Sequence, residues 1–330
     1  MNVHADVLSS GPRPHPEQSG NPHPVRATVR AMTVFGVHTG LQHITMPELR
    51  KLWRRIEDLG YGWISIWDHF YSATFKPDDA YCQEAIAAHA TLAADTSRVR
   101  VGSLVYCAGY RHPAVLANAM STIDQISNGR CDFGIGAGWA EVEYEAYGIP
   151  FLPIKDRMDM LEESIQCTKM LMNEEISNFS GKYFSLNNAR CEPKPVQDRL
   201  PIWVGGGGEQ RTLKIAAKYA DAWNVPFVSP EEFAHKRTVL HRHCETIGRD
   251  PAELRCAVNL GIAWNEDSLV SQFGGLTERV RPGVLTGSEQ QVVDRIGEYV
   301  TAGADQVNLA LRAPIQVDDI ERFAAVLKLA

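Results

Sequence analysis

Eight short runs rich in β-branched and aromatic residues alternate with stretches of helical periodicity from Thr33 onward. This regular alternation is typical of repeated βα units, in which helices join parallel strands. Eight similar units without a central nucleotide-binding loop favour closure into a barrel over an open doubly wound sheet. The sequence therefore predicts one (β/α)8 TIM-barrel domain with insertion segments over residues 32–330. The expected strands are residues 34–38, 63–67, 99–106, 131–137, 201–205, 222–225, 254–263 and 306–311.

Two of the connecting helices carry clear start signals. Residues 45–48 (Thr-Met-Pro-Glu) and 288–291 (Ser-Glu-Gln-Gln) each place a hydroxyl three residues before Glu or Gln, which predicts a capping box. Apolar residues then recur at helical spacing until Gly60 and Gly303, which are typical helix terminators. A last helix is expected over 317–329.

Three segments depart from this rhythm. Residues 174–200 and 264–286 contain Gly and Pro without a clear period, and long loops in a compact domain are commonly functional. Both are therefore candidates for a lid or a substrate wall. Residues 1–31 contain five prolines and little periodic apolar content, which predicts a flexible arm. A translation start near Met32, or an arm that packs on a partner subunit, would also explain that segment.

Composition excludes several classes of function. The net charge is −7 and the basic residues are scattered among acidic ones, so no basic stripe is available for nucleic acid. The seven cysteines are widely spaced and form no Cys-x-x-Cys pair, which favours a reducing cytoplasm and gives no sign of a metal site. No apolar run approaches the roughly 20 residues that span a bilayer. We expect a cytoplasmic protein that is not exported.

An acid and an imidazole follow the second expected strand. Asp68 and His69 stand at its carboxyl end, where barrel enzymes assemble their active sites. His69 is the first candidate for a proton donor or hydrogen-bond partner to a reacting group, although a loop histidine that caps a helix has the same signature. Asp68 is expected to orient a neighbour rather than to react.

Small residues end the third and fourth strands and would let a flat ligand approach the backbone. The glycine-rich run 134–139 does not match the dinucleotide motif, because a Trp stands where the last glycine is required. The Trp is expected to wall the pocket, and the glutamates at 141, 143 and 145 are interpreted as a solvent-exposed face. The candidate cofactor-binding residues are Ser103, Leu104, Gly136, Ala137, Gly138 and Trp139.

Four consecutive glycines follow the fifth strand, directly before a helix. Glycines at a helix N-terminus expose backbone N–H groups that bind phosphate, and an arginine adds positive charge nearby. The Gly-Lys-Ser/Thr sequence of a P-loop is absent. The residues of this predicted anion site are Gly205, Gly206, Gly207, Gly208 and Arg211.

Taken in order, five motifs resemble the luciferase-like monooxygenase superfamily, and within it the actinobacterial F420-dependent oxidoreductases. They are residues 67–70 (Trp-Asp-His-Phe), 102–105 (Gly-Ser-Leu-Val), 110–113 (Tyr-Arg-His-Pro), 134–139 (Gly-Ile-Gly-Ala-Gly-Trp) and 205–208. The resemblance covers nearly all of residues 32–330. It implies a (β/α)8 barrel with a cofactor ring across the mouth and the cofactor phosphate near the glycine turn.

The resemblance also implies roles for individual residues. Asp68 and His69 match residues that contact the redox ring in F420 enzymes. A non-prolyl cis peptide, expected by position at Ser103–Leu104, supports that ring. Family members that oxidise sugar phosphates carry a catalytic glutamate where this chain has Trp139, which argues against glucose 6-phosphate as substrate.

The expected activity is hydride transfer between coenzyme F420 and a small organic substrate, in either direction. The alternative is an FMN-dependent monooxygenase that uses molecular oxygen and a separate cofactor reductase, and a barrel that binds flavin without turnover is a third hypothesis. Because F420 has an acidic tail, a basic groove would favour it, and Lys214, Lys218 and Arg312 are candidates for its lining. The resemblance further implies a homodimer.

Overall fold

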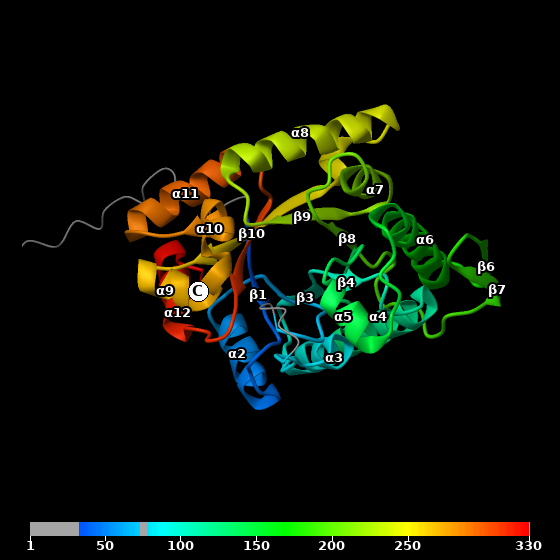
Figure 1. Cartoon of the computed structure of the whole chain (residues 1–330), viewed down its shortest axis with the longest axis horizontal. Helices are drawn as coiled ribbons and strands as arrows, with labels where there is room; N and C mark the ends of the chain where they lie inside the picture. Colours follow the sequence, from blue (N-terminus) through cyan, green and yellow to red (C-terminus); the bar gives the residue numbers. More distant parts are fainter. Residues whose placement is uncertain (1–32, 73–77, 330) are drawn as a thin grey trace, which may run out of the picture.

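The computed structural model describes residues 33–72 and 78–329, so the expected arm at residues 1–31 lies outside the described residues. Within them, eight parallel strands close into a barrel, because β1 pairs on one side with β2 and on the other with β12 (Figure 1). The predicted (β/α)8 barrel is confirmed. The barrel strands are β1 (Val34–Thr39), β2 (Trp63–Ile66), β3 (Arg100–Ser103), β5 (Cys131–Gly136), β8 (Ile202–Gly205), β9 (Ala222–Pro226), β10 (Arg255–Ile262) and β12 (Gln306–Leu311).

Helices form the outer layer, and both predicted capping boxes are present, at Thr45 and at Ser288. The last helix ends two residues earlier than expected, because Lys328 adopts a left-handed conformation. The main helices are α2 (Met46–Asp58), α3 (Ala85–Asp95), α4 (Pro113–Ser127), α6 (Ile154–Asn173), α7 (Thr212–Tyr219), α8 (Pro230–Thr246), α11 (Glu289–Thr301) and α12 (Val317–Leu327).

The third strand differs from the expectation in two ways. It is interrupted after β3, and the short strand β4 (Tyr106–Cys107) then pairs with β5. The non-prolyl cis peptide joins Leu104 and Val105, one residue later than the predicted Ser103–Leu104 bond. The Leu104 N–H still donates to the Ile66 carbonyl at 2.8 Å, so the ladder with β2 continues through Leu104 before the chain leaves it.

The two insertion segments take different places. Residues 174–200 contain an antiparallel hairpin of β6 (Ser177–Ser180) and β7 (Ser185–Ala189), which lies beyond α6 on the outside of the barrel (Figure 1). This hairpin does not wall the central cavity, contrary to the expectation. Residues 264–286 form α9 (Glu266–Phe273), α10 (Thr277–Val280) and β11 (Val284–Leu285), and β11 pairs with the end of β10.

Large aromatic side chains fill the lower half of the barrel interior. The Trp63 and Trp203 rings stack with centroids 5.1 Å apart, and Trp63 Nε1 donates to Asp132 at 2.7 Å. A Cβ at Gly102 would lie 2.6 Å from the Trp63 ring, so this glycine makes room for the indole. These indole rings thus pack inside the barrel near the amino ends of β2 and β8.

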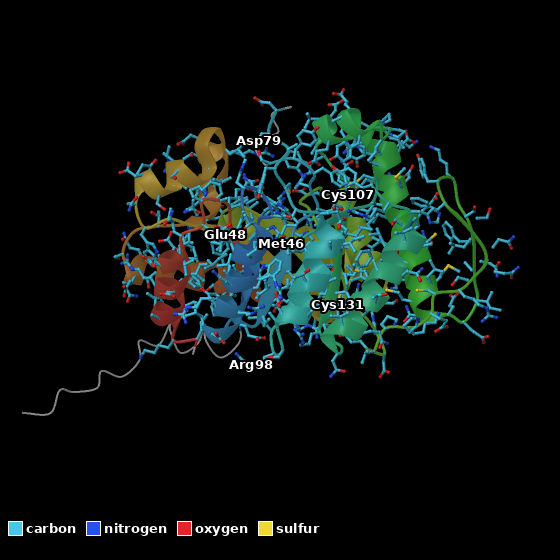
Figure 2. All side chains as sticks on the ribbon, turned by 90° about the horizontal axis from the view of Figure 1, so that it is seen from below. Met46, Glu48, Asp79, Arg98, Cys107 and Cys131 are labelled. Carbon is cyan, nitrogen blue, oxygen red and sulfur yellow. The ribbon has the colours of Figure 1, made fainter. Side chains whose placement is uncertain are left out.

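Figure 2 shows this axis from the side. Arg98 and Cys131, which precede or begin strands, lie low in the view, whereas Cys107, which ends β4, and Asp79, in the connection from β2 to α3, lie higher. In residues 33–72 and 78–329, no helix has the length and apolar character needed to cross a membrane.

Candidate active site

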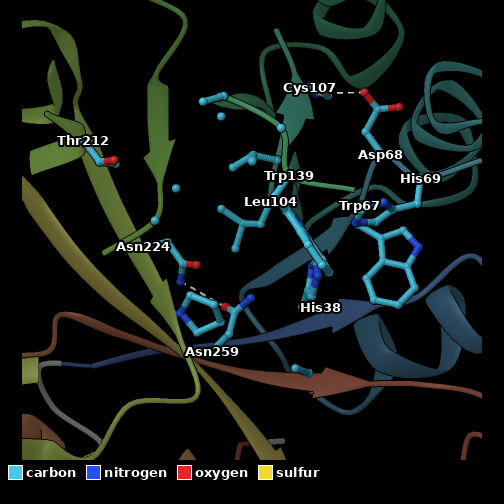
Figure 3. A pocket seen from close by; sticks show the side chains of 18 of the residues that line it. His38, Trp67, Asp68, His69, Leu104, Cys107, Trp139, Thr212, Asn224 and Asn259 are labelled. Atoms are coloured by element: carbon cyan, nitrogen blue, oxygen red, sulfur yellow. Dashed lines mark hydrogen bonds between the residues drawn. The ribbon is translucent and has the colours of Figure 1, made fainter. Parts of the chain in front are cut away.

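A cavity of about 360 Å³ occupies the carboxyl ends of the barrel strands. Figure 3 shows its wall, in which the side chains of the β1, β2, β9 and β10 strand ends converge. Most of the predicted site residues line it, namely Asp68, His69, Leu104, Gly136, Ala137, Gly138, Trp139, Gly205 and Gly206. Four predicted residues do not: Ser103, Gly207, Gly208 and Arg211.

His69 is held by a buried glutamate. Its Nδ1 lies 3.0 Å from Glu143 Oε2 and 3.1 Å from Oε1. Glu143 also accepts hydrogen bonds from the backbone N–H groups of Phe70 and Tyr71, both at 2.9 Å, and from the Tyr110 hydroxyl. These contacts commit the Nδ1 edge of the ring to Glu143, so chemistry directed to the cavity would use Nε2.

The charge of Glu143 is stabilised despite its complete burial. Burial acts to raise its pKa, but the hydrogen bonds from His69, Tyr110 and the backbone outweigh it and hold the pKa below the ordinary value. A carboxylate here favours a proton on the facing His69 nitrogen.

Glu143 is the site residue that the sequence reading missed. Its helix, α5 (Glu141–Tyr147), exposes Glu141 and Glu145, as expected for a solvated face, but buries Glu143. A seven-residue helix is too short for its buried face to be inferred from periodicity. The burial of Glu143 results from its tertiary contact with the loop after β2, and no local sequence pattern predicts that contact.

Asp68 contacts two neighbouring residues. Its Oδ2 accepts a hydrogen bond from the Cys107 N–H at 2.9 Å (Figure 3). The same oxygen pairs with Arg111 Nη1 at 2.6 Å. Burial raises the pKa of Asp68 above its ordinary value, and the Arg111 charge opposes that rise. Arg111 also pairs with Glu84 at 2.6 Å, so one guanidinium ties β2 to the segment before α3.

The glycines at the ends of β5 and β8 make room for Val105. A Cβ at Gly136 would lie 2.6 Å from Val105 Cγ2, and one at Gly205 would lie 2.8 Å from Cγ1. The bulge at Leu104 and Val105 therefore projects into the barrel between these two strands. Ser103 lies beneath it, with its hydroxyl bonded to the Gly134 carbonyl at 3.0 Å.

In the glycine turn at the end of β8, Gly205 and Gly206 line the cavity, whereas Gly207 and Gly208 do not. The Gly206 N–H donates to the Asn224 carbonyl at 2.9 Å, and the Gly207 carbonyl accepts from Lys236 Nζ at 3.1 Å. Thr212, the first residue of α7, is the side chain from this turn that lines the cavity.

Arg211 points away from the cavity. Its Nη2 lies 2.5 Å from Asp159, and it lines a separate hollow together with Lys214 and Lys218. Lys218 pairs there with Glu162 at 3.0 Å. Arg312, the third candidate for a basic groove, lines the main cavity instead.

Two further cavity residues, His38 and Arg312, were not among the predicted catalytic or cofactor-binding residues, although Arg312 was a candidate for the lining of a basic groove. His38, at the end of β1, bonds through Nδ1 to the Ser65 hydroxyl at 2.8 Å, and burial lowers its pKa to about 3. Arg312 follows β12, and burial lowers its pKa to about 10, which leaves it cationic at neutral pH. Both stand at carboxyl ends of expected strands, and that position was the available signal.

Residues 25–272 match the family model for luciferase-like monooxygenases. The chain belongs to this family. Among curated relatives, an uncharacterized protein of Mycobacterium tuberculosis is 32% identical over 149 residues, 44% of this chain and 52% of that protein. An F420-dependent glucose-6-phosphate dehydrogenase of Kineococcus radiotolerans is 30% identical over 208 residues, 62% of this chain and 60% of that enzyme. The chain thus spans between half and two thirds of the length of these relatives.

Solved structures share the luciferase-like fold over most of the chain. An F420-dependent secondary alcohol dehydrogenase in complex with an F420-acetone adduct has a TM-score of 0.81 at 20% identity, covering 90% of this chain and 98% of that one. The oxygenating constituent of 3,6-diketocamphane monooxygenase from Pseudomonas putida, in complex with FMN, has a TM-score of 0.69 at 17% identity, covering 90% and 96%. At these identities the likeness shows the fold alone.

Proposed function

We propose that this chain is an F420-dependent oxidoreductase that transfers hydride between the deazaflavin and a small organic substrate. The observation that carries the proposal is the Glu143-held His69 at the mouth of the barrel cavity. The relatives named as F420-dependent enzymes support this choice of cofactor.

The cavity residues fit a flat redox ring. One apolar surface of the cavity, here called the shelf, is formed by Leu104, Val105 and Ala137. The Trp139 ring meets the His69 ring edge-on, with centroids 5.7 Å apart. Ligand sites of this kind are mostly apolar with a few oriented polar groups. For the cofactor phosphate we propose the Gly205 to Gly208 turn with the Thr212 hydroxyl, rather than Arg211.

The bound cofactor would supply or accept the hydride. The chain's own residues orient the reactants, exclude water and manage the proton. Glu143 fixes His69 through Nδ1, and Nε2 is then the atom that gives a proton to the reduced substrate or takes one from an alcohol. The second candidate is an FMN-dependent monooxygenase, supported by the family and by the FMN-containing neighbour.

Side-by-side fluorescence titrations with F420 and FMN test the cofactor. Tight F420 binding with negligible FMN binding is expected, and the opposite preference would transfer the assignment to the monooxygenase, with a reductase partner. A His69→Ala variant should keep F420 affinity within about tenfold but lose about 10²- to 10⁴-fold in turnover. Unchanged turnover would remove His69 from the mechanism.

We also propose a cytoplasmic homodimer, which sedimentation of the purified chain would test.

A further inference from the structure

Arg312 occupies an aromatic box at one side of the cavity. Its guanidinium carbon lies 5.5 Å from the centroid of the Trp67 ring, 5.6 Å from that of Phe273 and 6.0 Å from that of Phe227. Arg312, Trp67 and Phe227 all line the cavity. The guanidinium is thus held in place by ring faces, which leave its N–H groups for other partners.

No Asp or Glu within residues 33–72 and 78–329 forms an ion pair with Arg312, and burial is the sole cause of its lowered pKa. Arg111, which contacts Asp68 behind the same wall, has two carboxylate partners at 2.6 Å. Asp68 is therefore already neutralised, and it does not balance Arg312.

Three other polar side chains that line the cavity carry no charge. His38 is kept neutral by burial and by the Arg312 charge, and Asn224 and Asn259 form an amide pair at 3.0 Å. Arg312 is partly buried, and removing a cation even in part from water without an anion is costly, a cost that aromatic faces offset only in part. A bound anionic ligand would offset the rest of this free-energy cost.

Trp67 links this cation to the proposed proton site. Its ring meets His69 edge-on at 5.6 Å on one side and Arg312 at 5.5 Å on another. A small ligand in the cavity is therefore within reach of both groups.

We propose that Arg312 binds a carboxylate of the substrate, so that the substrate class is a small oxo-carboxylic acid whose carbonyl faces His69. A planar guanidinium matches a carboxylate through two parallel hydrogen bonds, which fixes orientation as well as affinity. This inference rests on the proposed function. In the reduction, the carbonyl carbon gains hydride from the reduced deazaflavin, the oxygen gains a proton from His69, and the carboxylate is unchanged.

Binding of benzoate and of its neutral isostere benzamide to the full chain, followed by tryptophan fluorescence, tests the subsite directly. The wild type should prefer benzoate by about tenfold or more. Arg312→Gln should abolish that preference while leaving F420 affinity within about twofold. Arg312→Lys retains the charge and should keep part of the preference, which guards against a folding defect in the glutamine variant.

Arg322→Gln is the matched control, because Arg322 also stacks on an aromatic ring, Trp264 at 3.9 Å, but lies on the outer helix α12. It should leave the preference intact. Equal binding of the two probes by the wild type, or a preference that survives Arg312→Gln, would overturn the inference, as would a large loss of F420 affinity in that variant. If benzoate binding depends on Arg312 but the chain does not bind F420, the carboxylate subsite stands and the proposed function is wrong.

Discussion

Glu143 Oε2 lies 3.0 Å from His69 Nδ1 across 74 residues of sequence, and it is the contact that gives the barrel mouth a fixed imidazole. The same carboxylate receives two backbone N–H groups from the loop after β2. One buried charge thus orders both the histidine and the loop that carries it.

Replacing Glu143 with Gln should lower turnover about 10- to 100-fold while leaving F420 affinity nearly unchanged. The amide preserves the shape of the side chain, but it carries no negative charge, and its NH₂ group competes with the donors around it. Steady-state kinetics should show the loss in kcat rather than in KM, and the pH profile should shift on its acidic limb. A variant with wild-type kcat and an unchanged profile would reduce Glu143 to a structural role.

Replacing Glu143 with Ala should lower the free energy of unfolding of the protein. The Phe70 and Tyr71 N–H groups would lose their acceptor in a buried site, at a cost of about 2–4 kcal/mol in the free energy of unfolding. Chemical denaturation of this variant beside Glu141→Ala, which alters an exposed residue of the same helix, provides the comparison. Equal stabilities would show that water replaces the carboxylate at no cost.

The barrel was predictable from sequence, whereas only one residue of the His69–Glu143 contact was. Strand and helix positions follow from local patterns of apolar and turn residues, and those patterns run through the whole chain. His69 could be singled out because it follows an expected strand. Glu143 belongs to a short helix, and its burial depends on contacts with Phe70 and Tyr71, 73 and 72 residues earlier. Arg211 follows the glycine turn in sequence, but its side chain pairs with Asp159 outside the cavity, which no local pattern shows.

The two buried histidines should make the protein sensitive to acid. Burial lowers the pKa of His38 to about 3 and that of His89 to about 4, below the value of about 6.5 in an unfolded chain. The unfolded state therefore binds the protons first, so stability is complete above pH 6.5 and falls as the pH drops toward 3–4. Each histidine should remove about 2 kcal/mol between pH 7 and pH 5.

Unfolding free energies of His38→Asn and His89→Asn, measured at several pH values, check this contribution. Each variant should lose part of the pH dependence between pH 7 and pH 5, although its stability at pH 7 falls. A wild-type slope in both variants would assign the acid sensitivity to carboxylates instead.

Gly136 and Val105 should show strong energetic coupling. Gly136→Ala places a methyl 2.6 Å from Val105 Cγ2 and should destabilise the protein by about 1–3 kcal/mol while distorting the shelf. Val105→Ala in the same chain opens the space and should recover part of both stability and F420 affinity. If the effects of the two substitutions on the free energy of unfolding are additive in a double-mutant cycle, the bulge shifts to accommodate the added methyl group without a cost that depends on Val105.

Thr212→Val should weaken F420 binding more than Arg211→Ala does. Thr212 lines the cavity beside the glycine turn, whereas Arg211 pairs with Asp159 at 2.5 Å in a separate hollow. Loss of a hydroxyl that bonds a phosphate is expected to lower affinity by about 10- to 100-fold, since a hydrogen bond to a charged group contributes about 1.5–3 kcal/mol. F420 lacking its glutamate tail provides the control, because it tests the phosphate contact alone. If Arg211→Ala has the greater effect with that ligand, the phosphate lies on the outer side of the turn, and the cofactor enters the cavity from the direction of α7.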